Sequence, residues 1–328
     1  MAKKTVINRA AKRYINTSTD SNIFKYAQES EQRQRKEVLD AEVEENANQE
    51  QLDFEQPVLE EAQYTELEND KPIDVSDFEE NKRTCNRKRK RRRAILIETI
   101  ATGSSGNCYV LNDGRTTLLL EAGIKFERVQ KHFKYKTRHI AGCLITHEHG
   151  DHAKYTKQFV DNGVISYMTA GTQQAMNFES HRLCTIKAKQ ELRIGTWSIL
   201  PFDIEHDANE PVAFLLQSTL GYKVLYVTDT KYLKYKFNGI THMMLEVNYI
   251  YEQIQENIKN GSVHSTLANR IMESHFSLEH AIGMLKANDL TRLEEIHLIH
   301  LSSQNSNAKY IKSEIQKVTG APVYFGGL

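Results

Sequence analysis

The sequence Thr146-His147-Glu148-His149-Gly150-Asp151-His152 follows the apolar run 141–145 and decides the fold. The apolar run predicts a buried strand, and a strand cannot continue through the polar residues that come after it. We therefore expect four ligand-type side chains on a tight loop at the carboxyl end of that strand. Imidazole and carboxylate groups suit zinc, manganese or iron, and the lack of a thiolate in the motif disfavours a structural zinc finger.

The spacing of these side chains indicates two metal ions. His147 and His149 can face one ion, while Asp151 and His152 face a second. The alternative is a chance cluster of histidines on a solvated loop. The distribution of histidine weighs against it, since all 13 histidines lie after residue 131. We expect the chemistry in the later part of the chain, at a hydrolase site for two metals.

The first 93 residues differ in composition from the rest of the 328-residue chain. Residues 1–86 contain 20 acidic and 12 basic residues, and their apolar residues occur singly. Such a segment buries too little apolar surface to offset the entropy lost on folding. We expect a disordered acidic tail over residues 1–93, with at most a transient helix over residues 30–40, followed by one folded domain over residues 94–328.

Seven consecutive basic residues, 87–93, end this tail. Such a block repels itself and stays extended. It can contact nucleic acid or serve as a solvated linker. The linker is favoured because no aromatic residue interleaves the run.

The folded part is close to neutral, with 24 basic and 23 acidic residues over 94–328. Neutrality argues against a protein that coats nucleic acid, but it allows a local positive groove. The four cysteines form no Cys-x-x-Cys pair, so we expect a reduced chain in the cytoplasm of a bacterial host cell rather than a disulfide framework. We expect neither a membrane span nor a signal peptide.

Strands and helices are predicted to alternate along the folded part. Strands are expected at 94–100, 108–111, 117–120, 142–145, 197–204, 212–217, 223–228, 243–246 and 296–301. Helices are expected after Gly123 to about Phe133 and at 249–260, 265–273, 278–288 and 308–318. This order indicates an α/β fold in which two sheets are covered by helices, not an all-β sandwich.

The motif His147-x-His149-x-Asp151-His152, with 118–123 before it and 227–230 after it, resembles the metallo-β-lactamase-fold metallohydrolases. Finer details are similar to their YycJ (WalJ)-like exonuclease branch. Those details are Gly103-Ser104-Ser105-Gly106-Asn107, His206-Asp207-Ala208 ahead of Glu210-Pro211-Val212, Leu245-Glu246-Val247-Asn248-Tyr249, Ser274-His275-Phe276-Ser277 and His300-Leu301-Ser302. The resemblance implies a four-layer αβ/βα sandwich with metals at one edge of its two sheets.

The resemblance also implies the ligands of two divalent ions, Zn²⁺ or Mn²⁺. One ion would be held by His147, His149 and His206, the other by Asp151, His152 and His300, and Asp229 would bridge the two. The three distant ligands each follow a predicted strand, so converging strand ends can bring them together. Glu121 departs from the family, which usually has Asp there, although the longer side chain can still orient a ligand histidine.

Two residues are expected to be catalytic, Asp151 as a ligand and His275 as an acid. His275 precedes Ser277, an expected helix N-cap. The resemblance implies that His275 faces the substrate and protonates the leaving oxygen. The alternative is a surface histidine beside the cap.

Residues 1–9 carry a second, shorter resemblance. They read Met1-Ala2-Lys3-Lys4-Thr5-Val6-Ile7-Asn8-Arg9 and are similar to a stretch near the C-terminus of phage RecT-type single-strand annealing proteins. This resemblance would place the chain in a phage recombination module, which favours DNA as its substrate.

These features together predict a metal-dependent phosphodiesterase, above all a DNA exonuclease that uses a hydroxide shared by two metals. Two alternatives stay open: a phosphodiesterase acting on cyclic nucleotides or RNA, and a non-catalytic nucleic-acid-binding accessory of phage recombination. The enzyme is favoured because a pure binder has no need of seven converging ligands. The expected partner is nucleic acid, DNA first, with no membrane and with a homodimer left open.

Overall fold

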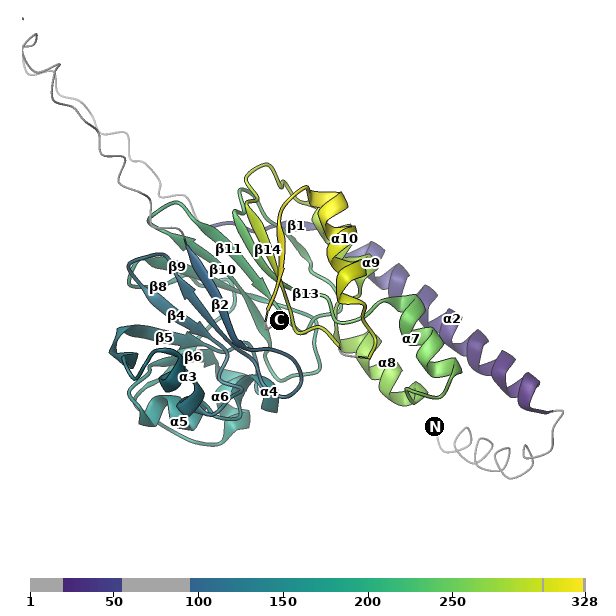
Figure 1. The fold of residues 1–328 in the computed structure, drawn as a ribbon, viewed down its shortest axis with the longest axis horizontal. Helices are drawn as coiled ribbons and strands as arrows, with labels where there is room; N and C mark the ends of the chain where they lie inside the picture. Colours follow the sequence, from purple (N-terminus) through teal and green to yellow (C-terminus); the bar gives the residue numbers. More distant parts are fainter. Residues whose placement is uncertain (1–19, 55–94, 303, 327–328) are drawn as a thin grey trace, which may run out of the picture.

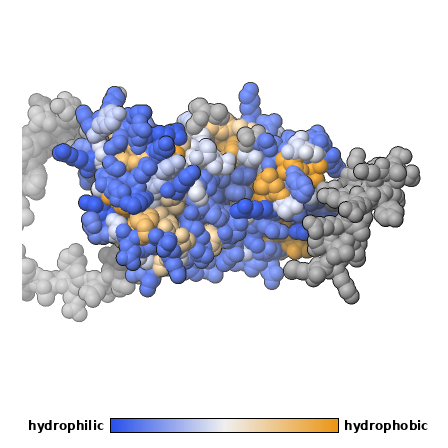
Figure 2. All heavy atoms as spheres, turned by 90° about the horizontal axis from the view of Figure 1, so that it is seen from below, coloured by the Kyte–Doolittle hydropathy of each residue, from blue (hydrophilic) through white to orange (hydrophobic). Residues whose placement is uncertain are grey.

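The structure, a computed structural model, describes residues 20–54, 95–302 and 304–326. Two β-sheets lie face to face, and helices cover their outer surfaces (Figure 1). This arrangement confirms the expected α/β class and the four-layer αβ/βα sandwich. The face seen from below carries mainly hydrophilic atoms around separate apolar patches (Figure 2).

The first sheet has six strands in the order β2-β3-β4-β5-β6-β7. They are β2 (Leu96–Ala101), β3 (Cys108–Asn112), β4 (Thr117–Leu120), β5 (Ile140–Leu144), β6 (Ser166–Thr169) and β7 (Leu183–Ile186). The pairs β2–β3 and β3–β4 are antiparallel, whereas β4 to β7 run parallel. The carboxyl ends of β4 and β5 therefore meet at the same edge of the sheet.

The second sheet has seven strands in the order β15-β14-β13-β11-β10-β9-β8. They are β8 (Leu192–Ile194), β9 (Trp197–Asp203), β10 (Val212–Ser218), β11 (Lys223–Val227), β13 (His242–Glu246), β14 (Glu295–Ile299) and β15 (Val323–Phe325). β11, β13 and β14 are parallel neighbours, and β9 runs in the same direction because β10 is antiparallel to both β9 and β11. Since β15 is also parallel to β14, five carboxyl ends thus meet at one edge of this sheet.

Strand β10 shows how the core is divided. Val212, Phe214 and Leu216 are buried between the two sheets, while Ala213 and Leu215 belong to the core cluster beneath the helices. Alternate side chains of a strand point to opposite faces, so a strand covered on both sides is apolar throughout.

Helices complete the two outer layers. α3 (Phe126–His132) and α5 (Thr156–Asp161) contribute to the cluster on the first sheet, and α9 (Leu278–Ala287) and α10 (Ala308–Thr319) to the cluster on the second. Residues 95–326 also form α4 (Gly150–Ala153), α6 (Ala170–Met176), α7 (Tyr251–Lys259), α8 (Ser265–Ser274) and the 3-10 helix Thr137–His139. Helix α9 begins where expected, because the Ser277 hydroxyl accepts a hydrogen bond from His280 N at 3.1 Å.

A buried carboxylate, Asp113, joins the two sheets at the edge opposite to the carboxyl ends of β4 and β11. It accepts hydrogen bonds from the backbone of Arg115 and Thr116, both at 2.9 Å, within its own hairpin. It also accepts from the hydroxyls of Thr196, in the turn before β9, and Ser218, the last residue of β10 in the other sheet. Burial raises the pKa of Asp113, but these hydrogen bonds lower it overall. The charged form is therefore the one that holds this edge together.

Residues 20–54 differ from the disorder expected for the whole of 1–93. They form α2 (Asp20–Asn46) and β1 (Glu50–Gln51), and β1 pairs in parallel with β12 (Tyr235–Lys236). Leu39 of α2 packs against an apolar cluster of α7 and α8. Glu42 pairs with Lys231 at 2.5 Å. The helix is stabilised by contacts with the rest of the chain, which composition does not reveal.

Other expectations fall outside the described residues. They concern residues 1–9, the basic run 87–93 and Cys85. Cys108, Cys143 and Cys184 have free thiols, and burial raises the pKa of Cys108 and Cys143 above the ordinary range. Within the described ranges, no helix is both long and apolar enough to cross a membrane.

Candidate metal centre

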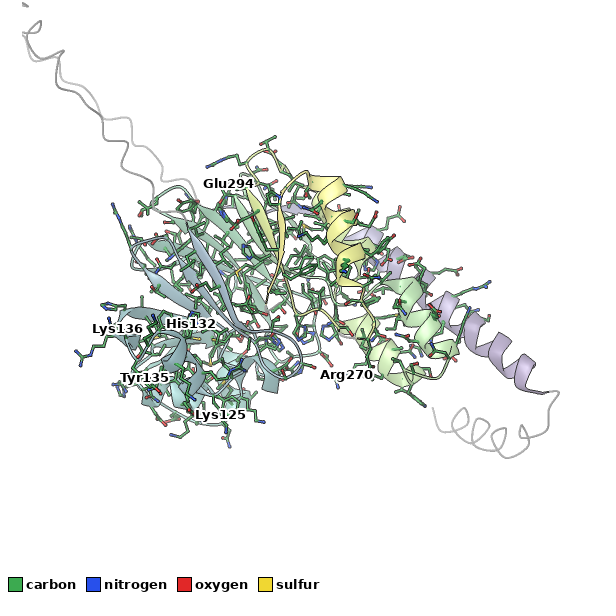
Figure 3. All side chains as sticks on the ribbon, viewed as in Figure 1. Lys125, His132, Tyr135, Lys136, Arg270 and Glu294 are labelled. Carbon is green, nitrogen blue, oxygen red and sulfur yellow. The ribbon has the colours of Figure 1, made fainter. Side chains whose placement is uncertain are left out.

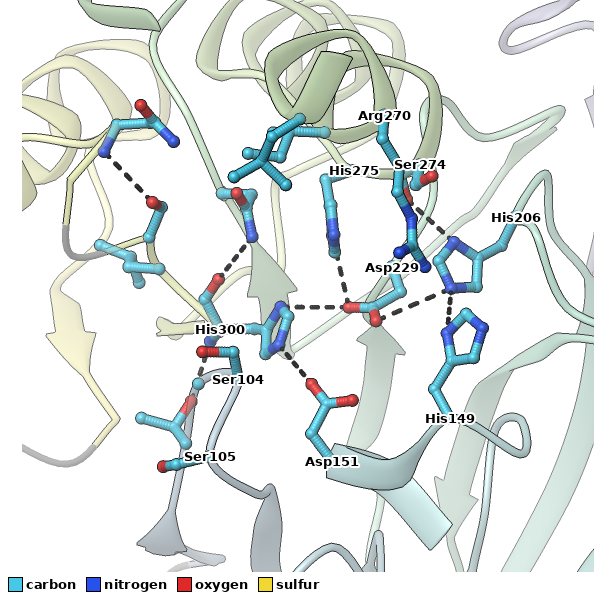
Figure 4. A pocket seen from close by; sticks show the side chains of 18 of the residues that line it. Ser104, Ser105, His149, Asp151, His206, Asp229, Arg270, Ser274, His275 and His300 are labelled. Atoms are coloured by element: carbon cyan, nitrogen blue, oxygen red, sulfur yellow. Dashed lines mark hydrogen bonds and ion pairs between the residues drawn. The ribbon is translucent and has the colours of Figure 1, made fainter. Parts of the chain in front are cut away.

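The expected ligands gather where the strand ends of both sheets meet (Figure 4). His147 follows β5, and His149, Asp151 and His152 lie in and just before α4. His206, Asp229 and His300 follow β9, β11 and β14, respectively. Asp229 and His300 turn the chain sharply, with φ of 49° and 52°. The same edge therefore receives side chains from both sheets.

The first group of side chains that could hold a metal ion is His147, His149, His206 and Asp229. His206 Nε2 lies 3.1 Å from His149 Nδ1 and 3.9 Å from Asp229 Oδ2. His206 Nδ1 lies 3.0 Å from the carbonyl oxygen of Ser274, which can only accept, so this nitrogen carries the proton. The lone pair of Nε2 is thereby turned toward the other ligand atoms.

The second group is Asp151, His152, Asp229 and His300. His152 Nε2 lies 3.1 Å from Asp229 Oδ2, and His300 Nε2 lies 3.1 Å from Asp151 Oδ2. Asp229 belongs to both groups, as expected of a bridging carboxylate. The structure thus brings all seven residues together in the two sets of the sequence analysis, while their coordination of metal stays a prediction.

The chemistry of His147 tests whether this pocket fits a metal. Its Nδ1 bonds with the Thr146 hydroxyl at 2.9 Å. Its Nε2 is buried and has no hydrogen-bond partner among the described residues, although Asp229 Oδ2 lies 3.6 Å away. A buried nitrogen without a partner costs free energy, and a cation at this point would satisfy it. The residues therefore fit a divalent ion.

Burial and mutual charge set the protonation of the ring nitrogens. Burial, with the nearby His152 ring, holds the pKa of His147 well below its ordinary value. Burial would also lower the pKa of His300, but the Asp229 carboxylate and hydrogen bonds to Asp151 and Glu246 raise it to about 10. His147 is thus neutral and ready to bind a cation, whereas protons and metal compete at His300.

Glu246, the last residue of β13, holds several site groups in place although no role was predicted for it. It is fully buried, and its Oε1 lies 2.7 Å from His275 Nδ1 and 2.9 Å from His300 Nδ1. Its Oε2 accepts a hydrogen bond from Asp229 N at 2.6 Å. A charged residue that ends an apolar strand at this edge was the signal in the sequence. A carboxylate of this kind orients ligand histidines.

Glu121 occupies the position where the sequence departs from the family. It is buried just after β4 with φ of 67°, and its Oε1 accepts a hydrogen bond from the Tyr226 hydroxyl at 2.9 Å. Its Oε2 accepts from Thr146 N at 3.3 Å and lies 3.6 Å from His152 Nδ1, beyond hydrogen-bond distance. Glu121 therefore supports the ligand loop through the backbone N–H of Thr146. It acts on the His152 ring through electrostatics, without a hydrogen bond.

His275 lies at the carboxyl end of α8 and faces the same centre. Its Nδ1 is held by Glu246, and its side chain is 19% exposed. Burial lowers its pKa, but the Glu246 carboxylate and its hydrogen bond raise the pKa above the ordinary value. His275 lines the cavity beside the two groups rather than the outer surface.

A cavity of about 810 Å³ opens over both groups. Its walls come from the loop 102–105, from α4, from α8 and from the loop after β14. Ser104 and Ser105 lie on the wall opposite α8 (Figure 4). Lys231, two residues after Asp229, is not among the lining residues and pairs with Glu42 of α2. The cavity leaves room for a substrate beside the ligand atoms.

The family described as the beta-lactamase superfamily domain matches residues 116–300, more than half of the chain. The chain belongs to this superfamily and is a metal-dependent hydrolase of the metallo-β-lactamase fold. The solved structure of the metallo-β-lactamase-fold protein YhfI from Bacillus subtilis superposes on this chain with a TM-score of 0.52 and 16% sequence identity. The match covers 70% of this chain and 95% of the YhfI chain. That likeness supports the fold.

Within the superfamily, two relatives place the chain more closely. Exodeoxyribonuclease WalJ of Streptococcus pneumoniae is 28% identical over 225 residues, which are 63% of this chain and 81% of the relative. Exodeoxyribonuclease YycJ of Bacillus anthracis is 24% identical over 246 residues, 68% of this chain and 89% of the relative. The resemblance to the YycJ-like branch is confirmed.

Proposed function

We propose that this protein hydrolyses the phosphodiester bonds of DNA, as an exonuclease, with two divalent ions held by the two ligand groups. One observation carries the proposal: Asp229 is shared between two groups of ligands under an open cavity. The names of the two relatives support DNA as the substrate. When bound, a pair of divalent ions activates water and stabilises the charge on the phosphoryl oxygens.

The side chains of the protein contribute positioning and a proton. Glu246 fixes the His275 ring through Nδ1, which leaves Nε2 free to carry a proton into the cavity. His275 protonates the leaving oxygen as the phosphodiester bond breaks. Asp151 and His300 hold each other at 3.1 Å, so that the second ligand group keeps its geometry. The buried surroundings strengthen these electrostatic interactions.

Metal analysis tests the two-ion part of the proposal. Protein purified with Zn²⁺ or Mn²⁺ in excess should contain about two ions per chain, because seven ligands that share Asp229 suit two sites. Asp229→Ala should contain fewer than one, since it removes a ligand from both groups. A content of at most one ion in the unmodified, metal-replete protein would refute the two-ion site.

A panel of substrates tests the reaction. End-labelled single-stranded and double-stranded DNA, RNA and cyclic nucleotides are offered in parallel with each metal. DNA should be shortened from an end, with the highest kcat/KM. A preference for RNA or a cyclic nucleotide would favour the alternative phosphodiesterase, and DNA binding without hydrolysis would favour the accessory. A place in phage recombination stays a separate prediction, which rests on residues 1–9 alone.

A further inference from the structure

Helix α8 presents two different faces. Ala268 and Met272 are buried in the cluster that α8 forms with α7 and with Leu39 of α2. Leu267, Arg270, Ile271 and Ser274 line the cavity over the ligand groups. These four positions have the i, i+3, i+4, i+7 spacing that places side chains on one face of a helix. The helix therefore forms one wall of the cavity through these four residues.

The charge of this wall is concentrated in one residue. Among the described residues that line the cavity, Arg270 is the one lysine or arginine, and it lies between α8 and the part of the chain that holds α4 (Figures 3 and 4). Apart from the histidines, the other ionisable lining residues are the aspartates Asp151, Asp207 and Asp229. Asp151 and Asp229 belong to the ligand groups, which leaves Arg270 and Asp207 outside them. Arg270 is thus the fixed positive charge available to an anionic substrate.

Arg270 is held near the ligand groups by a contact that exchanges easily. Its Nη2 lies 3.3 Å from Asp207 Oδ2, and Asp207 Oδ1 lies 3.5 Å from His206 Nε2. The Asp207 carboxylate therefore lies between the Arg270 guanidinium and His206 of the first ligand group. The side chains of Arg270 and Asp207 are 67% and 46% exposed. Exposed pairs of this kind contribute little stability, so a phosphate can replace Asp207 at little cost.

The residues beside Arg270 suit the rest of a nucleotide. Leu267 lies on the same wall and is 52% exposed, so its side chain is available for contact. Its apolar side chain can pack against a base or a sugar, whereas the planar guanidinium matches two oxygens of a phosphate. Helix α2 fixes the wall from behind, because Gln32 Nε2 donates a hydrogen bond to Asn269 Oδ1 at 2.9 Å and Arg35 pairs with Glu273.

We infer that the cavity face of α8 is a nucleotide-binding subsite, in which Arg270 binds the phosphate next to the one being hydrolysed and Leu267 packs against the adjoining nucleoside. This inference rests on the proposed function and narrows it. The preferred substrate is a nucleic acid chain with at least two neighbouring phosphates. A small phosphodiester that lacks the second phosphate does not reach Arg270.

The test compares two substrates in Arg270→Gln. The first is a 5′-phosphorylated thymidine trinucleotide, and the second is bis(p-nitrophenyl) phosphate, which has a single phosphate. Loss of a charge-assisted, two-pronged contact should lower kcat/KM on the trinucleotide by about 10- to 100-fold. The loss on the nitrophenyl compound should be at least ten times smaller. Arg270→Lys should fall between the wild type and Arg270→Gln, because it keeps the charge but not the fork.

Binding gives a second measurement that does not need turnover. Fluorescence anisotropy of a labelled trinucleotide, without added metal, should give a weaker Kd for Arg270→Gln by a similar factor. Its salt dependence should lose about one unit of slope. Arg193→Gln, an exposed arginine on strand β8 outside the cavity lining, is the matched control and should change neither measurement.

The outcomes separate this inference from the proposed function. If the wild type hydrolyses neither substrate with any metal, the proposed function itself is wrong. If the wild type hydrolyses both and Arg270→Gln loses equally on both, Arg270 acts at the reacting phosphate and the subsite is refuted. Unchanged kinetics and binding in a folded Arg270→Gln protein would also refute it.

Discussion

The ligand loop after β5 and the helix α2 are both rich in charge, yet they are held in place by different means. The loop places four ligand-type residues within six positions at the end of a buried strand, where the apolar run 141–145 fixes it. Helix α2 has few apolar residues and docks on the outer side of α7 to α9 through scattered contacts. Charged residues directly after a buried strand therefore indicate a functional site. Charged residues along a helix do not indicate whether that helix packs against the rest of the chain.

The largest effect is expected at the loop. Asp151→Ala removes a proposed ligand of the second group, and the Asp151 side chain is 22% exposed, so the fold should persist. We expect hydrolysis to fall by roughly three orders of magnitude or more, because the nucleophile depends on the metal pair. Initial rates on labelled DNA, with metal content and circular dichroism measured alongside, check this. A metal-bound Asp151→Ala protein with substantial activity would contradict the assignment.

His275 should matter next, through the proton rather than the metal. General acid assistance is worth about 10²- to 10⁴-fold, so His275→Ala should lower kcat by that order while metal content stays the same. A nitrophenyl leaving group needs no proton and should recover part of the loss. His181→Ala, an exposed histidine far along the chain, serves as the control. Equal impairment on both kinds of substrate would make His275 a positioning residue.

Glu246 holds His275, His300 and Asp229 in place, so its replacement should have an effect of intermediate size. Glu246→Ala leaves His275, His300 and Asp229 N without their shared acceptor. We expect a loss of about 10- to 100-fold in metal affinity, measured by competition with a chelating dye. The control is Glu295→Ala, which removes a carboxylate 3.0 Å from His297 at the other end of β14. Comparable losses in both variants would mean that Glu246 has no special role.

Removing the docked helix should affect stability rather than chemistry. A chain that begins after residue 54 keeps all proposed ligands but exposes the cluster around α7 and α8. We expect it to bind about two metals and to unfold at a lower Tm. Leu39→Ala in the full chain should cost about 1–2 kcal/mol of the free energy of unfolding, since Leu39 is partly buried. A Tm equal to that of the full chain would show that α2 is not docked in solution.

The smallest effect is expected from a single ion pair of α2. Lys231→Ala removes the partner of Glu42, both partly exposed. Such pairs contribute about 0–1 kcal/mol, and a double-mutant cycle with Glu42→Ala should return a coupling in that range. A coupling of several kcal/mol would mean that one charge, not many weak contacts, fixes the helix.

Much of the fold was visible in the sequence because its strands are short, apolar and bounded by turn residues. The strand predicted at 117–120 coincides with β4, and the helix predicted at 265–273 ends one residue short of α8. Strand β6 was missed because it is four residues long and half polar. The predicted strand 142–145 begins two residues late and ends one late, since β5 is Ile140–Leu144.

The site was predictable to different depths for different residues. The proposed ligands of the loop stand next to one another in sequence, and the local pattern sufficed to propose them. His206, Asp229 and His300 are separated by long segments, and only the resemblance indicated which strand ends converge. Glu246 lay in a motif of the resemblance but had no predicted role, and Arg270 lay in no motif, because their importance arises from what the fold places beside them.

Asp113 joins the two sheets at one edge of the sandwich, and the ligand groups lie at the opposite edge. Four hydrogen bonds to the Asp113 carboxylate hold the two sheets together at this edge without any metal. The opposite edge carries the two ligand groups, in which Asp151 and Asp229 face histidine rings that bound cations would hold together. Removal of bound metals by a chelator should therefore loosen the contact between the two sheets at the edge of the ligand groups. Amide hydrogen exchange would speed up around α4 and stay slow in the hairpins at Thr116, Thr196 and Ser218.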